Sequence, residues 1–563
     1  MMNNPKPISE FLVPGKRAHL VGIGGVSMCP LAEVLAGKGL LVQGSDMTES
    51  DSVKHLRSKG ISVAIGHNAE NLGDCDFVIR TAAVHDGNPE IAGAIARGIP
   101  VYERAQAWGG IMRSYRNALC ISGTHGKTTT TSMATHIFMA AQKDPTVMIG
   151  GTLPLLHGGY RVGQGDTIIL ESCEYCNSFL NFFPTVAVIL NVHADHLDFF
   201  KDLADIEQSF HRFAELVPEG TGRVVANLDD AGARAAVAGL DRPLFTYSVR
   251  DHSASCYADN VSMFDGCGEF DVMILGQRYA HVTLHVPGSH NVSNALAAAA
   301  AAYLLGVDGK AVEEGLAAFT GAGRRFEHKG TYHGAEVYDD YAHHPDEVEA
   351  LLNAARPLPH QRLICAFQPH TYTRTAALFD DFVEVLRLPD RVVLAEIYAA
   401  REKNDIGISS RDLAARIPGA VYCATLEQTA DELEKLEAVM DAGEYTGSVK
   451  DLINLTQNLD CFEFYPGVKD EEELGRMYIL EFEALTVPEH LIDYIDYEAY
   501  GRDVRINEGG HFAPGGYVFD NQSKFIEHYT GLDDIPEEYC ISHVQARDEK
   551  EETHSILAAI KQF

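Results

Sequence analysis

The sequence predicts an α/β protein built from three successive nucleotide-binding-type domains, followed by a small acidic α+β domain. Three observations lead to this prediction. The chain has 563 residues, which at roughly 100 to 200 residues per domain is too long for one core. Apolar strand patterns alternate with helical patterns up to about residue 430. Beyond that point the composition changes abruptly and becomes strongly acidic.

The overall composition excludes several classes of protein. Hydrophobic residues make up 46% and charged residues 22%, which is typical of a folded globular chain. Apolar runs stay below the length of about 18 residues that a membrane span requires. Residues Met1 to Pro14 lack the pattern of a secretory signal, and eleven scattered cysteines do not form a disulfide framework. We therefore expect a cytoplasmic protein with reduced thiols.

The first predicted domain covers residues 1–115 and opens with a strand, a glycine turn and a helix between 17 and 37. The turn, Gly22-Ile23-Gly24-Gly25-Val26-Ser27, is similar to a dinucleotide-binding fingerprint, and Asp46 ends the next strand. The third glycine of that fingerprint is missing, because residue 27 is serine. The turn is interpreted as a site for a nucleotide or sugar-nucleotide diphosphate; a nicotinamide site and a purely structural turn are the alternatives.

The second predicted domain, 116–322, carries the strongest motif, Gly123-Thr124-His125-Gly126-Lys127-Thr128-Thr129-Thr130. It follows the apolar strand 118–121 and precedes a helical pattern. Glycines let backbone N–H groups approach phosphate oxygens, the lysine reaches the outer phosphates, and the first threonine can hold Mg²⁺. The loop is shorter than a full Walker A motif. A phosphate site is the preferred interpretation, with a capped glycine turn as the alternative.

Two acidic clusters follow the phosphate loop at predicted strand ends. They are Glu171-Ser172-Cys173-Glu174 and the segment Asn191 to Asp198. Either cluster alone would be interpreted as a solvated loop. Behind a phosphate loop, their carboxylates are the hard oxygen ligands that Mg²⁺ and ATP chemistry require.

Polar residues also cluster at the start of a later helix and in the third predicted domain, 323–430. The segment Pro287 to Ala295 places Ser, His and Asn on the first turn of an Ala-rich helix, where helix capping is the simpler explanation. Segments 324–327, 339–345 and 368–374 concentrate Arg, His and Asp after strands. This density predicts a site for anionic groups.

The acidic domain is predicted from charge. Residues 431–563 contain 31 acidic and 10 basic residues, a net charge of −21, whereas residues 1–430 have a net charge of −14. About a quarter of the chain therefore carries most of the excess negative charge, which indicates a junction near residue 431.

Together, these motifs resemble the Mur ligase family over roughly residues 12–430. The resemblance depends on blocks that occur in the family's order: Gly-Ile-Gly-Gly-Val-Ser at 22, Gly-Ser-Asp at 44, Gly-Thr-His-Gly-Lys-Thr-Thr-Thr at 123, Glu-Ser-Cys-Glu-Tyr at 171, Asn-Val-His-Ala-Asp-His at 191, Gly-Ser-His-Asn at 288, Arg-Arg-Phe-Glu at 324, Asp-Asp-Tyr-Ala-His-His-Pro at 339 and Phe-Gln-Pro-His at 367.

The resemblance implies a Rossmann-like UDP-binding domain, a P-loop ATPase domain and a Rossmann-like C-terminal domain. It also implies an activity: ATP phosphorylates the lactyl carboxylate of UDP-N-acetylmuramate, and the amine of L-alanine attacks the acyl phosphate, as a step in peptidoglycan precursor synthesis. The implied cofactors are ATP and Mg²⁺. No direct binding to nucleic acid or membrane is expected.

The resemblance further implies a role for individual residues. The implied substrate-binding residues are Gly24, Gly25, Ser27, Ser45 and Asp46. The implied ATP-binding residues are Gly123, Thr124, His125, Gly126, Lys127, Thr128, Thr129, His290, Asn291, Asn294, Arg325 and Asp340. The implied Mg²⁺ ligands, direct or through water, are Thr128, Glu171 and His196. The implied catalytic residues are Lys127, His196, Arg325, His343, His344, His370 and Arg374.

The chain departs from the family after residue 427. The family's third domain continues for several tens of residues with a further strand, and this sequence does not show that continuation, so a truncated third domain is expected. Instead, the blocks at 495–504, 508–512 and 534–539 resemble the C-terminal part of ArdA-type antirestriction proteins, which imitate the charge of DNA. The expected partner of this region is a type I restriction enzyme, and a solvated acidic domain without such a partner is the alternative.

Two explanations of this arrangement remain open at the level of sequence. The chain is either a genuine fusion or an accidental join of two reading frames, with the join preferred. The alternative function is that of an acidic DNA mimic carried by the C-terminal region, with the ligase part inactive through truncation.

Overall fold

The computed structural model describes residues 6–441 except 82–83, 198, 333–334 and 401, then residue 455 and residues 458–527 except 483, 486 and 514. The predicted block at 534–539 lies outside the described residues. The described chain divides into two compact units. The first unit consists of Met1–Glu327, Tyr338–Ala342 and Ala350–Pro359, and the second of His328–Val337, His343–Glu349 and His360–Phe563.

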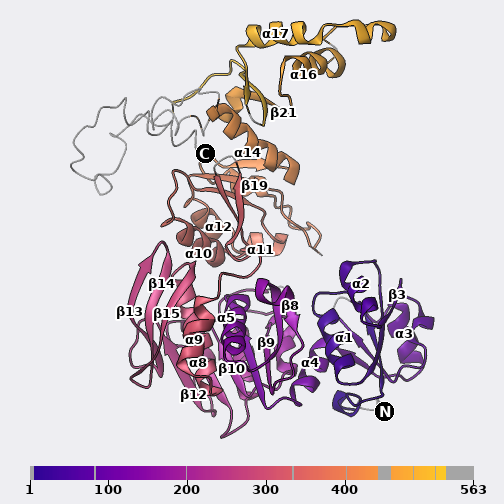
Figure 1. Cartoon of the computed structure of the whole chain (residues 1–563), viewed down its shortest axis with the longest axis vertical. Coiled ribbons are helices and arrows are strands. Elements are labelled where there is room, and N and C mark those ends of the chain that lie inside the picture. The colour runs from indigo at the N-terminus through magenta and orange to yellow at the C-terminus, as the bar shows by residue number, and fades with distance from the viewer. Residues whose placement is uncertain are drawn as a thin grey trace. The chain divides into compact units, whose positions relative to one another are not determined.

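The first unit begins with a five-stranded parallel sheet in the order β3-β2-β1-β4-β5. Figure 1 draws this part of the chain in indigo, with α1, α2, α3 and β3 labelled. This order places the change of winding direction between β1 and β4, as in doubly wound nucleotide-binding folds. The sheet is formed by β1 Arg17–Val21, β2 Leu41–Asp46, β3 Ser62–Ile65, β4 Phe77–Arg80 and β5 Val101–Glu103. Its helices are α1 Met28–Gly37, α2 Asp51–Ser58, α3 Pro89–Ala96 and α4 Arg104–Met112, and the short 3₁₀ turns are η1 Ile8–Glu10 and η2 Ala69–Leu72.

The rest of the first unit contains a ten-stranded mixed sheet in the order β15-β14-β13-β12-β11-β10-β6-β9-β7-β8. Its strands are β6 Asn117–Ser122, β7 Thr146–Leu153, β8 Gly158–Arg161, β9 Thr167–Glu171, β10 Val186–Ile189, β11 Arg223–Asn227, β12 Leu244–Ser248, β13 Cys256–Phe264, β14 Cys267–Ile274 and β15 Gln277–Pro287. Its helical elements are α5 Lys127–Ala140, η3 Pro154–Leu156, η4 Tyr175–Asn181, α6 Leu203–Glu215, α7 Ala231–Ala236, α8 His290–Leu304 and α9 Gly309–Ala317.

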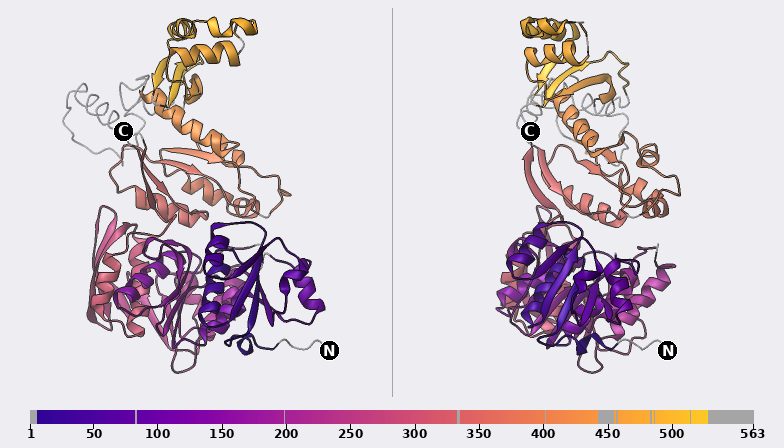
Figure 2. Two further views of the ribbon diagram at one scale, coloured as in Figure 1. Left: turned by 45° about the vertical axis from the view of Figure 1, so that its right-hand side comes forward. Right: turned by 90° about the vertical axis from the view of Figure 1, so that its right-hand side faces the viewer.

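The two sheets of the first unit share one continuous apolar core and lie side by side (Figure 2). Helix α4 packs on η4, and the guanidinium of Arg113 lies 3.7 Å from the ring centroid of Phe183. Gly109 faces the carbonyl of Asn181 so closely that a Cβ atom there would lie 1.9 Å from that oxygen. The second half of α4 is therefore packed closely against η4 beside the central sheet.

The second unit contains a three-stranded parallel sheet, β18-β19-β20, and a three-stranded antiparallel sheet, β21-β23-β22. Its strands are β18 Ile364–Phe367, β19 Arg391–Ala395, β20 Val421–Cys423, β21 Phe462–Pro466, β22 His511–Ala513 and β23 Gly516–Asp520. The hairpin β16 Glu327–Tyr332 with β17 Ala335–Asp339 and the helix α10 Pro345–Ala355 belong partly to each unit. The other helices are α11 Tyr372–Ala377, α12 Phe379–Val385, α13 Ser410–Ala414, α14 Leu426–Asp441, α16 Glu471–Arg476 and α17 Tyr497–Glu508, with the shorter helical turns η5 Leu459–Cys461, η6 Met477–Glu481 and η7 Glu489–Tyr494.

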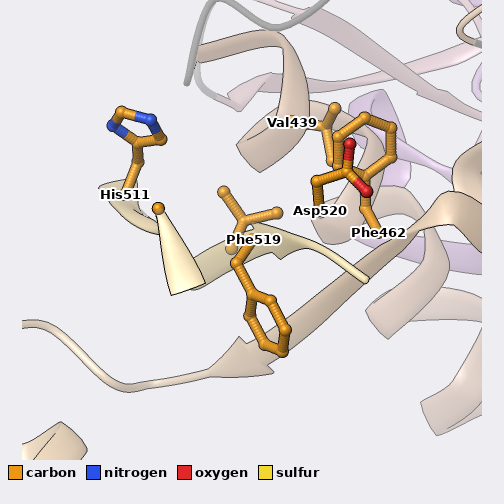
Figure 3. A pocket seen from close by; sticks show the side chains of 7 residues that line it. Val439, Phe462, His511, Phe519 and Asp520 are labelled. Atoms are coloured by element: carbon orange, nitrogen blue, oxygen red, sulfur yellow. The ribbon is translucent and has the colours of Figure 1, made fainter. Parts of the chain in front are cut away.

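Helix α14 contacts both sheets of the second unit. Near its middle, Glu432 accepts a hydrogen bond from buried Arg391 of β19 at 2.8 Å. Near its end, Ala438 and Val439 are buried in one apolar cluster with Phe462 of the antiparallel sheet. Figure 3 shows Val439 and Phe462 at a pocket that His511, Phe519 and Asp520 also line. The predicted junction at residue 431 therefore lies inside a continuous helix rather than between two structures.

Shortening Val439 to alanine should destabilise the antiparallel sheet by about 2 kcal/mol, because it removes two buried methyl groups from the apolar cluster. Native-state hydrogen exchange at the amides of β21 and β23 measures this change in the full chain. Leu426→Ala is the control, since Leu426 is 59% exposed at the start of the same helix. Equal protection in both variants would contradict a shared core between α14 and the sheet.

The predicted α/β alternation is present. The strand, glycine turn and helix predicted between 17 and 37 are β1, the turn of residues 22–27 and α1. The Ala-rich helix whose first turn was predicted within 287–295 is α8. Among the described helices, none is both long enough and apolar enough to cross a membrane.

Candidate functional site

The phosphate loop connects β6 to α5 at the carboxyl edge of the central sheet. Gly126 has a left-handed backbone (φ +81°), and a Cβ atom there would lie 2.7 Å from Oδ1 of Asn294. Gly123 has φ +151°, and its Cβ would lie 2.8 Å from Leu190. Both positions therefore require glycine. The turn leads directly into the first turn of α5, where backbone N–H groups have no intrahelical acceptors and favour an anion.

Lys127 is held over the loop by its own backbone and by one acid. Its Nζ donates to the carbonyl oxygens of Gly123 at 2.5 Å and Thr124 at 3.0 Å, and to the Glu174 carboxylate at 3.0 and 3.2 Å. Burial by itself would lower the pKa of Lys127, but the charge of Glu174 outweighs it and holds that pKa above its ordinary value. Lys127 therefore stays positively charged, and its ammonium group lies beside the backbone of the phosphate loop.

Thr128 and Glu171 form a second pair beside the loop. The Thr128 hydroxyl donates to the two carboxylate oxygens of Glu171 at 3.0 and 3.2 Å. Glu171 ends β9, and one of its oxygens also accepts from the backbone N–H of Gly150 at 2.7 Å. This arrangement brings a hydroxyl and a carboxylate close enough together to bind the same metal ion.

The loop after β10 supports the phosphate loop from the other side. The Asn191 side chain accepts from the backbone N–H of His125 at 2.7 Å and donates to the His125 carbonyl at 3.1 Å. The backbone N–H of His193 donates to the Thr124 hydroxyl at 2.9 Å, and Nε2 of His193 lies 2.8 Å from Asp230. Asp230 in turn caps α7 through the N–H of Ala233. The two loops are thus fixed to each other by side-chain to backbone hydrogen bonds.

His196 lies next to the acids of this site in a strained conformation. Its φ of +52° is unusual for a residue other than glycine. Its Nε2 lies 3.8 Å from Glu174 and 3.7 Å from Asp195, and its ring lies 4.7 Å from that of Tyr175. Backbone strain of this kind is maintained only where the surrounding structure imposes it, and it is concentrated at functional sites.

The start of α8 approaches the same loop. Asn294 accepts from the Thr130 hydroxyl at 3.2 Å and donates to Asn291 at 3.1 Å, while Asn291 donates to the carbonyl of Pro287 at 2.7 Å. Both asparagines are buried, whereas His290 is exposed beside them. The Asn side chains are therefore structural links between α8 and α5, in addition to any contact with a ligand.

Arg325 and Asp340 lie at the end of the first unit. The backbone N–H of Gly323 donates to the carbonyl of Thr152 at 2.8 Å, which fixes this segment to the end of β7. Asp340 accepts from the backbone N–H groups of Phe326 and Ala342, each at 2.7 Å. The guanidinium of Arg325 lies 5.5 Å from the ring centroid of Tyr341.

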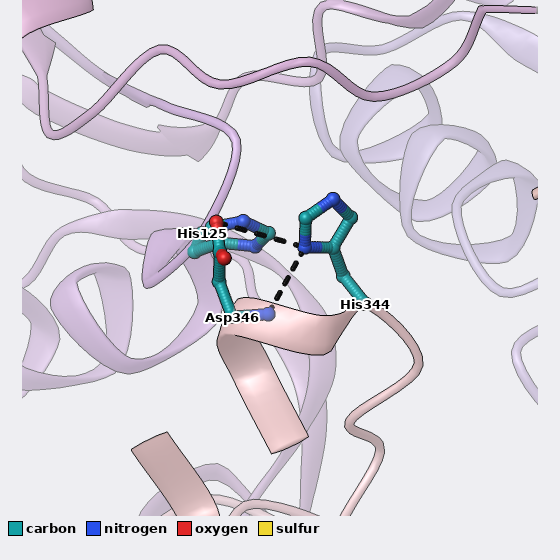
Figure 4. Close-up of side chains that lie close together, drawn as sticks. All are labelled: His125, His344 and Asp346. Carbon is teal, nitrogen blue, oxygen red and sulfur yellow. Dashed lines mark hydrogen bonds and ion pairs between the residues drawn. The ribbon is translucent and has the colours of Figure 1, made fainter. Parts of the chain in front are cut away.

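The remaining predicted catalytic residues gather in the second unit. Nη1 of Arg374 lies 3.2 Å from Nδ1 of His370, and the rings of His343 and His370 are 5.7 Å apart. His344 is buried, and its Nδ1 accepts from the backbone N–H of Asp346 at 3.3 Å (Figure 4). His343, His370 and Arg374 therefore lie close together in the second unit.

The glycine turn of the first domain is fixed by Asp46, whose carboxylate accepts from the backbone N–H of Gly24 at 2.9 Å. Ser45 is fully buried, and its hydroxyl donates to Glu90 at 2.6 Å and lies 3.1 Å from His67. Its side chain is thus already engaged within the domain. The Ser27 hydroxyl accepts a hydrogen bond from Arg104.

The sequence patterns identified the segments but not every contact within them. Glu174 and Asn191 stood in the predicted motifs, yet their roles, holding Lys127 and the backbone of His125, depend on how the two loops face each other. Asp230 stands outside every motif, and only its position as a helix cap after a strand could have suggested it.

The site is suited to phosphate chemistry. A helix N-terminus and a charged lysine favour the phosphates of a nucleotide. The hydroxyl of Thr128 and the carboxylate of Glu171 are oxygen donors of the kind that Mg²⁺ prefers, whereas a histidine nitrogen is better suited to contact through water. The donor set of the described residues therefore fits Mg²⁺.

Family models match almost the whole chain up to the acidic region. The Mur ligase family catalytic domain matches residues 17–116, the Mur ligase middle domain matches 121–302, and the Mur ligase glutamate ligase domain matches 324–446. The antirestriction protein (ArdA) model matches residues 394–519. The last two matches overlap, and α14 lies in both.

Individual relatives agree with the family models. UDP-N-acetylmuramate–L-alanine ligases from Agathobacter rectalis and Clostridium novyi are 49% and 44% identical over 70% and 76% of this chain, which are 86% and 93% of their own lengths. The crystal structure of the UDP-N-acetylmuramate-alanine ligase of Thermotoga maritima matches with a TM-score of 0.60 and 32% identity, over 74% of this chain and 92% of that one. A murein peptide ligase from Psychrobacter arcticus matches with a TM-score of 0.55 and 27% identity, over 68% of this chain and 85% of that one. The phosphate loop, the acidic residues beside it and the order of the sheets agree with these matches. The chain therefore belongs to the Mur ligase family.

Proposed function

We propose that this chain is an ATP-dependent ligase that joins L-alanine to the lactyl carboxylate of UDP-N-acetylmuramate. The observation that carries the proposal is the pairing of Lys127 with Glu174 and of Thr128 with Glu171 around one phosphate loop. Relatives named for this reaction, similar over 86% to 93% of their lengths, support it. The product is a precursor of peptidoglycan.

The reaction has two steps that need no covalent intermediate with the enzyme. A carboxylate oxygen of the lactyl group attacks the γ-phosphorus of ATP, and ADP leaves. The alanine nitrogen then attacks the acyl carbon, a proton leaves the nitrogen, and phosphate departs. Catalysis of such steps depends on alignment and on neutralising the charge of the transferred phosphoryl group.

Residues of the central sheet would supply that neutralisation. Lys127 would exchange its Glu174 partner for the γ-phosphate, and the N–H groups of residues 123–129 would surround the phosphates. Thr128 and Glu171 would hold Mg²⁺ directly, with His196 acting through water. When bound, Mg²⁺ neutralises charge on the phosphate oxygens. His290, Asn291 and Asn294 would contact the adenine side of ATP.

The other parts of the chain would bind the remaining substrate groups. Gly24, Gly25, Ser27, Ser45 and Asp46 would hold the UDP-sugar, with Ser45 contributing through its backbone because its hydroxyl is bonded to Glu90. Arg325 and Asp340 would contact the nucleotide. The cluster of His343, His344, His370 and Arg374 would bind the carboxylate and the amino acid.

Phosphate release by the purified full chain tests this function. Release is measured with ATP and Mg²⁺, with and without UDP-N-acetylmuramate and L-alanine. Release that requires both substrates is expected. No release from chain that still binds ATP would contradict the proposed activity and would indicate that the third domain does not complete the site.

A second function is proposed for the acidic region, namely imitation of DNA. The match of residues 394–519 to the antirestriction family and the net charge of −21 over 431–563 favour it. The described acidic side chains that are exposed include Asp460, Glu463, Asp470, Glu472, Glu473, Glu481, Asp496, Glu498 and Asp503. A protein that competes for a DNA site must present dense negative charge to a basic cleft.

This second function is tested with the full chain, because α14 is shared between the two sheets of the second unit. Cleavage by a type I restriction enzyme should be inhibited at low salt and progressively less as salt is raised. If the full chain does not inhibit cleavage at low salt, the proposal that the acidic region imitates DNA is contradicted.

A further inference from the structure

Arg104 lies at the crevice where the first sheet changes its winding direction. It is the first residue of α4 and follows β5 directly. Its Nη1 donates to the hydroxyl of Ser27, which stands between the glycine turn and α1. Since β4 lies between β5 and β1, the guanidinium reaches across the carboxyl end of β4. Ligands of doubly wound sheets bind at this place.

Arg104 has no carboxylate partner within the described part of the chain. The neighbouring acid, Glu103, accepts instead from Nε of Arg80 at 2.8 Å, and the hydrogen-bond partner of Arg104 is the neutral hydroxyl of Ser27. The side chain is only partly exposed, and burial lowers the pKa of its guanidinium while Cys173 and Glu103 partly offset that effect. An arginine remains charged at any physiological pH, so this is a partly desolvated cation without a matching anion.

The surroundings of Arg104 connect it to the ATP site. Cys173, which influences its pKa, precedes Glu174, the residue that holds Lys127 at 3.0 Å. The close packing of α4 on η4 brings the two domains together here, because Gly109 contacts the carbonyl of Asn181 without room for a side chain. Arg104 therefore lies between the glycine turn of the first domain and the acidic loop of the central one.

We propose that Arg104 binds an oxyanion of the UDP-sugar and thereby positions the sugar toward the phosphate loop; this inference rests on the proposed function. The guanidinium fork is suited to two oxygens of a phosphate or a carboxylate. Two groups of UDP-N-acetylmuramate have this chemistry, the diphosphate and the lactyl carboxylate. Binding would replace the Ser27 hydroxyl with a charged partner.

The test measures affinity for two sugar nucleotides by calorimetry, with the full chain and the variants Arg104→Met and Arg104→Lys. UDP-N-acetylmuramate carries both oxyanions, whereas UDP-N-acetylglucosamine carries only the diphosphate. Arg104→Met should weaken the binding of UDP-N-acetylmuramate about 10- to 100-fold, and Arg104→Lys should recover part of this lost affinity. A parallel loss for both ligands identifies the diphosphate, and a loss confined to UDP-N-acetylmuramate identifies the carboxylate.

Arg116→Met is the matched control, because Arg116 is exposed in the segment between α4 and β6. Thermal unfolding and ATP affinity report whether each variant is folded. Unchanged affinity of folded Arg104→Met for both sugar nucleotides would overturn the inference. If the unmodified chain binds neither sugar nucleotide, the proposed function itself fails, which is a different result from a failure of Arg104 alone.

Discussion

Replacing Lys127 with methionine should reduce substrate-dependent phosphate release about 1,000-fold. The Nζ atom is the cation of the phosphate loop, and in this structure it is held at 3.0 Å from Glu174 and 2.5 Å from the carbonyl of Gly123. Methionine keeps the length of the side chain but cannot neutralise the charge on a transferred phosphoryl group. Losing one such electrostatic contact typically costs a factor of about 100 to 1,000.

The same substitution also breaks a buried ion pair, which by itself lowers stability. Glu174 then remains without its lysine, so the double variant Lys127→Met with Glu174→Gln separates the catalytic effect from the cost of an unpaired acid. Lys143→Met is the control, since Lys143 is exposed just beyond the same helix. A rate for Lys127→Met within a few-fold of the control would contradict the role of the loop in phosphoryl transfer.

Replacing Glu90 with alanine should destabilise the first domain by about 3 to 5 kcal/mol. Glu90 is fully buried and accepts from His19 at 2.9 Å, Ser45 at 2.6 Å and Asn71 at 2.6 Å. These donors come from β1, β2 and η2, so one carboxylate joins three elements. Its removal leaves buried donors without an acceptor. Native-state hydrogen exchange at the amides of β1 and β2 measures the loss.

Glu90 also predicts how stability changes with pH. Burial alone would raise its pKa, but the hydrogen bonds from His19, Ser45 and Asn71 lower it from 4.5 to about 2. A carboxyl whose pKa is lower in the folded state stabilises the fold above pH 4.5 and loses that contribution as the pH falls to 2. The loss amounts to about 3 kcal/mol by linkage.

The pH effect is isolated by comparing the unmodified chain with Glu90→Gln, because other carboxylates titrate over the same range. The difference in stability between the two should decrease between pH 4.5 and 2. Glu70→Gln is the control, as Glu70 is exposed in the neighbouring η2 turn. A difference that stays constant with pH would mean that Glu90 is not charged in the folded domain.

The sequence predicted the alternation of strands and helices in the first 430 residues and the position of the glycine-rich loop, which lies between β6 and α5. Alternating apolar runs and glycine turns are local signals, and Gly126 and Gly123 leave no room for another residue. The family resemblance rested on these local blocks, and the family matches over 17–116, 121–302 and 324–446 agree with it.

Other features were decided only by the tertiary structure. The Glu90 network joins β1, β2, η2 and α3, whose residues are up to 71 positions apart, and no spacing along the chain indicates it. No sequence pattern distinguishes Arg104, a single arginine after a short strand, because its position depends on the hydrogen bond that it makes across β4 to Ser27. Likewise, a change of composition at residue 431 indicated a boundary, whereas α14 passes through it and packs on both sheets. Local patterns specify backbone conformation, but the contacts that give a buried charge or a helix face its role form only when distant segments pack together.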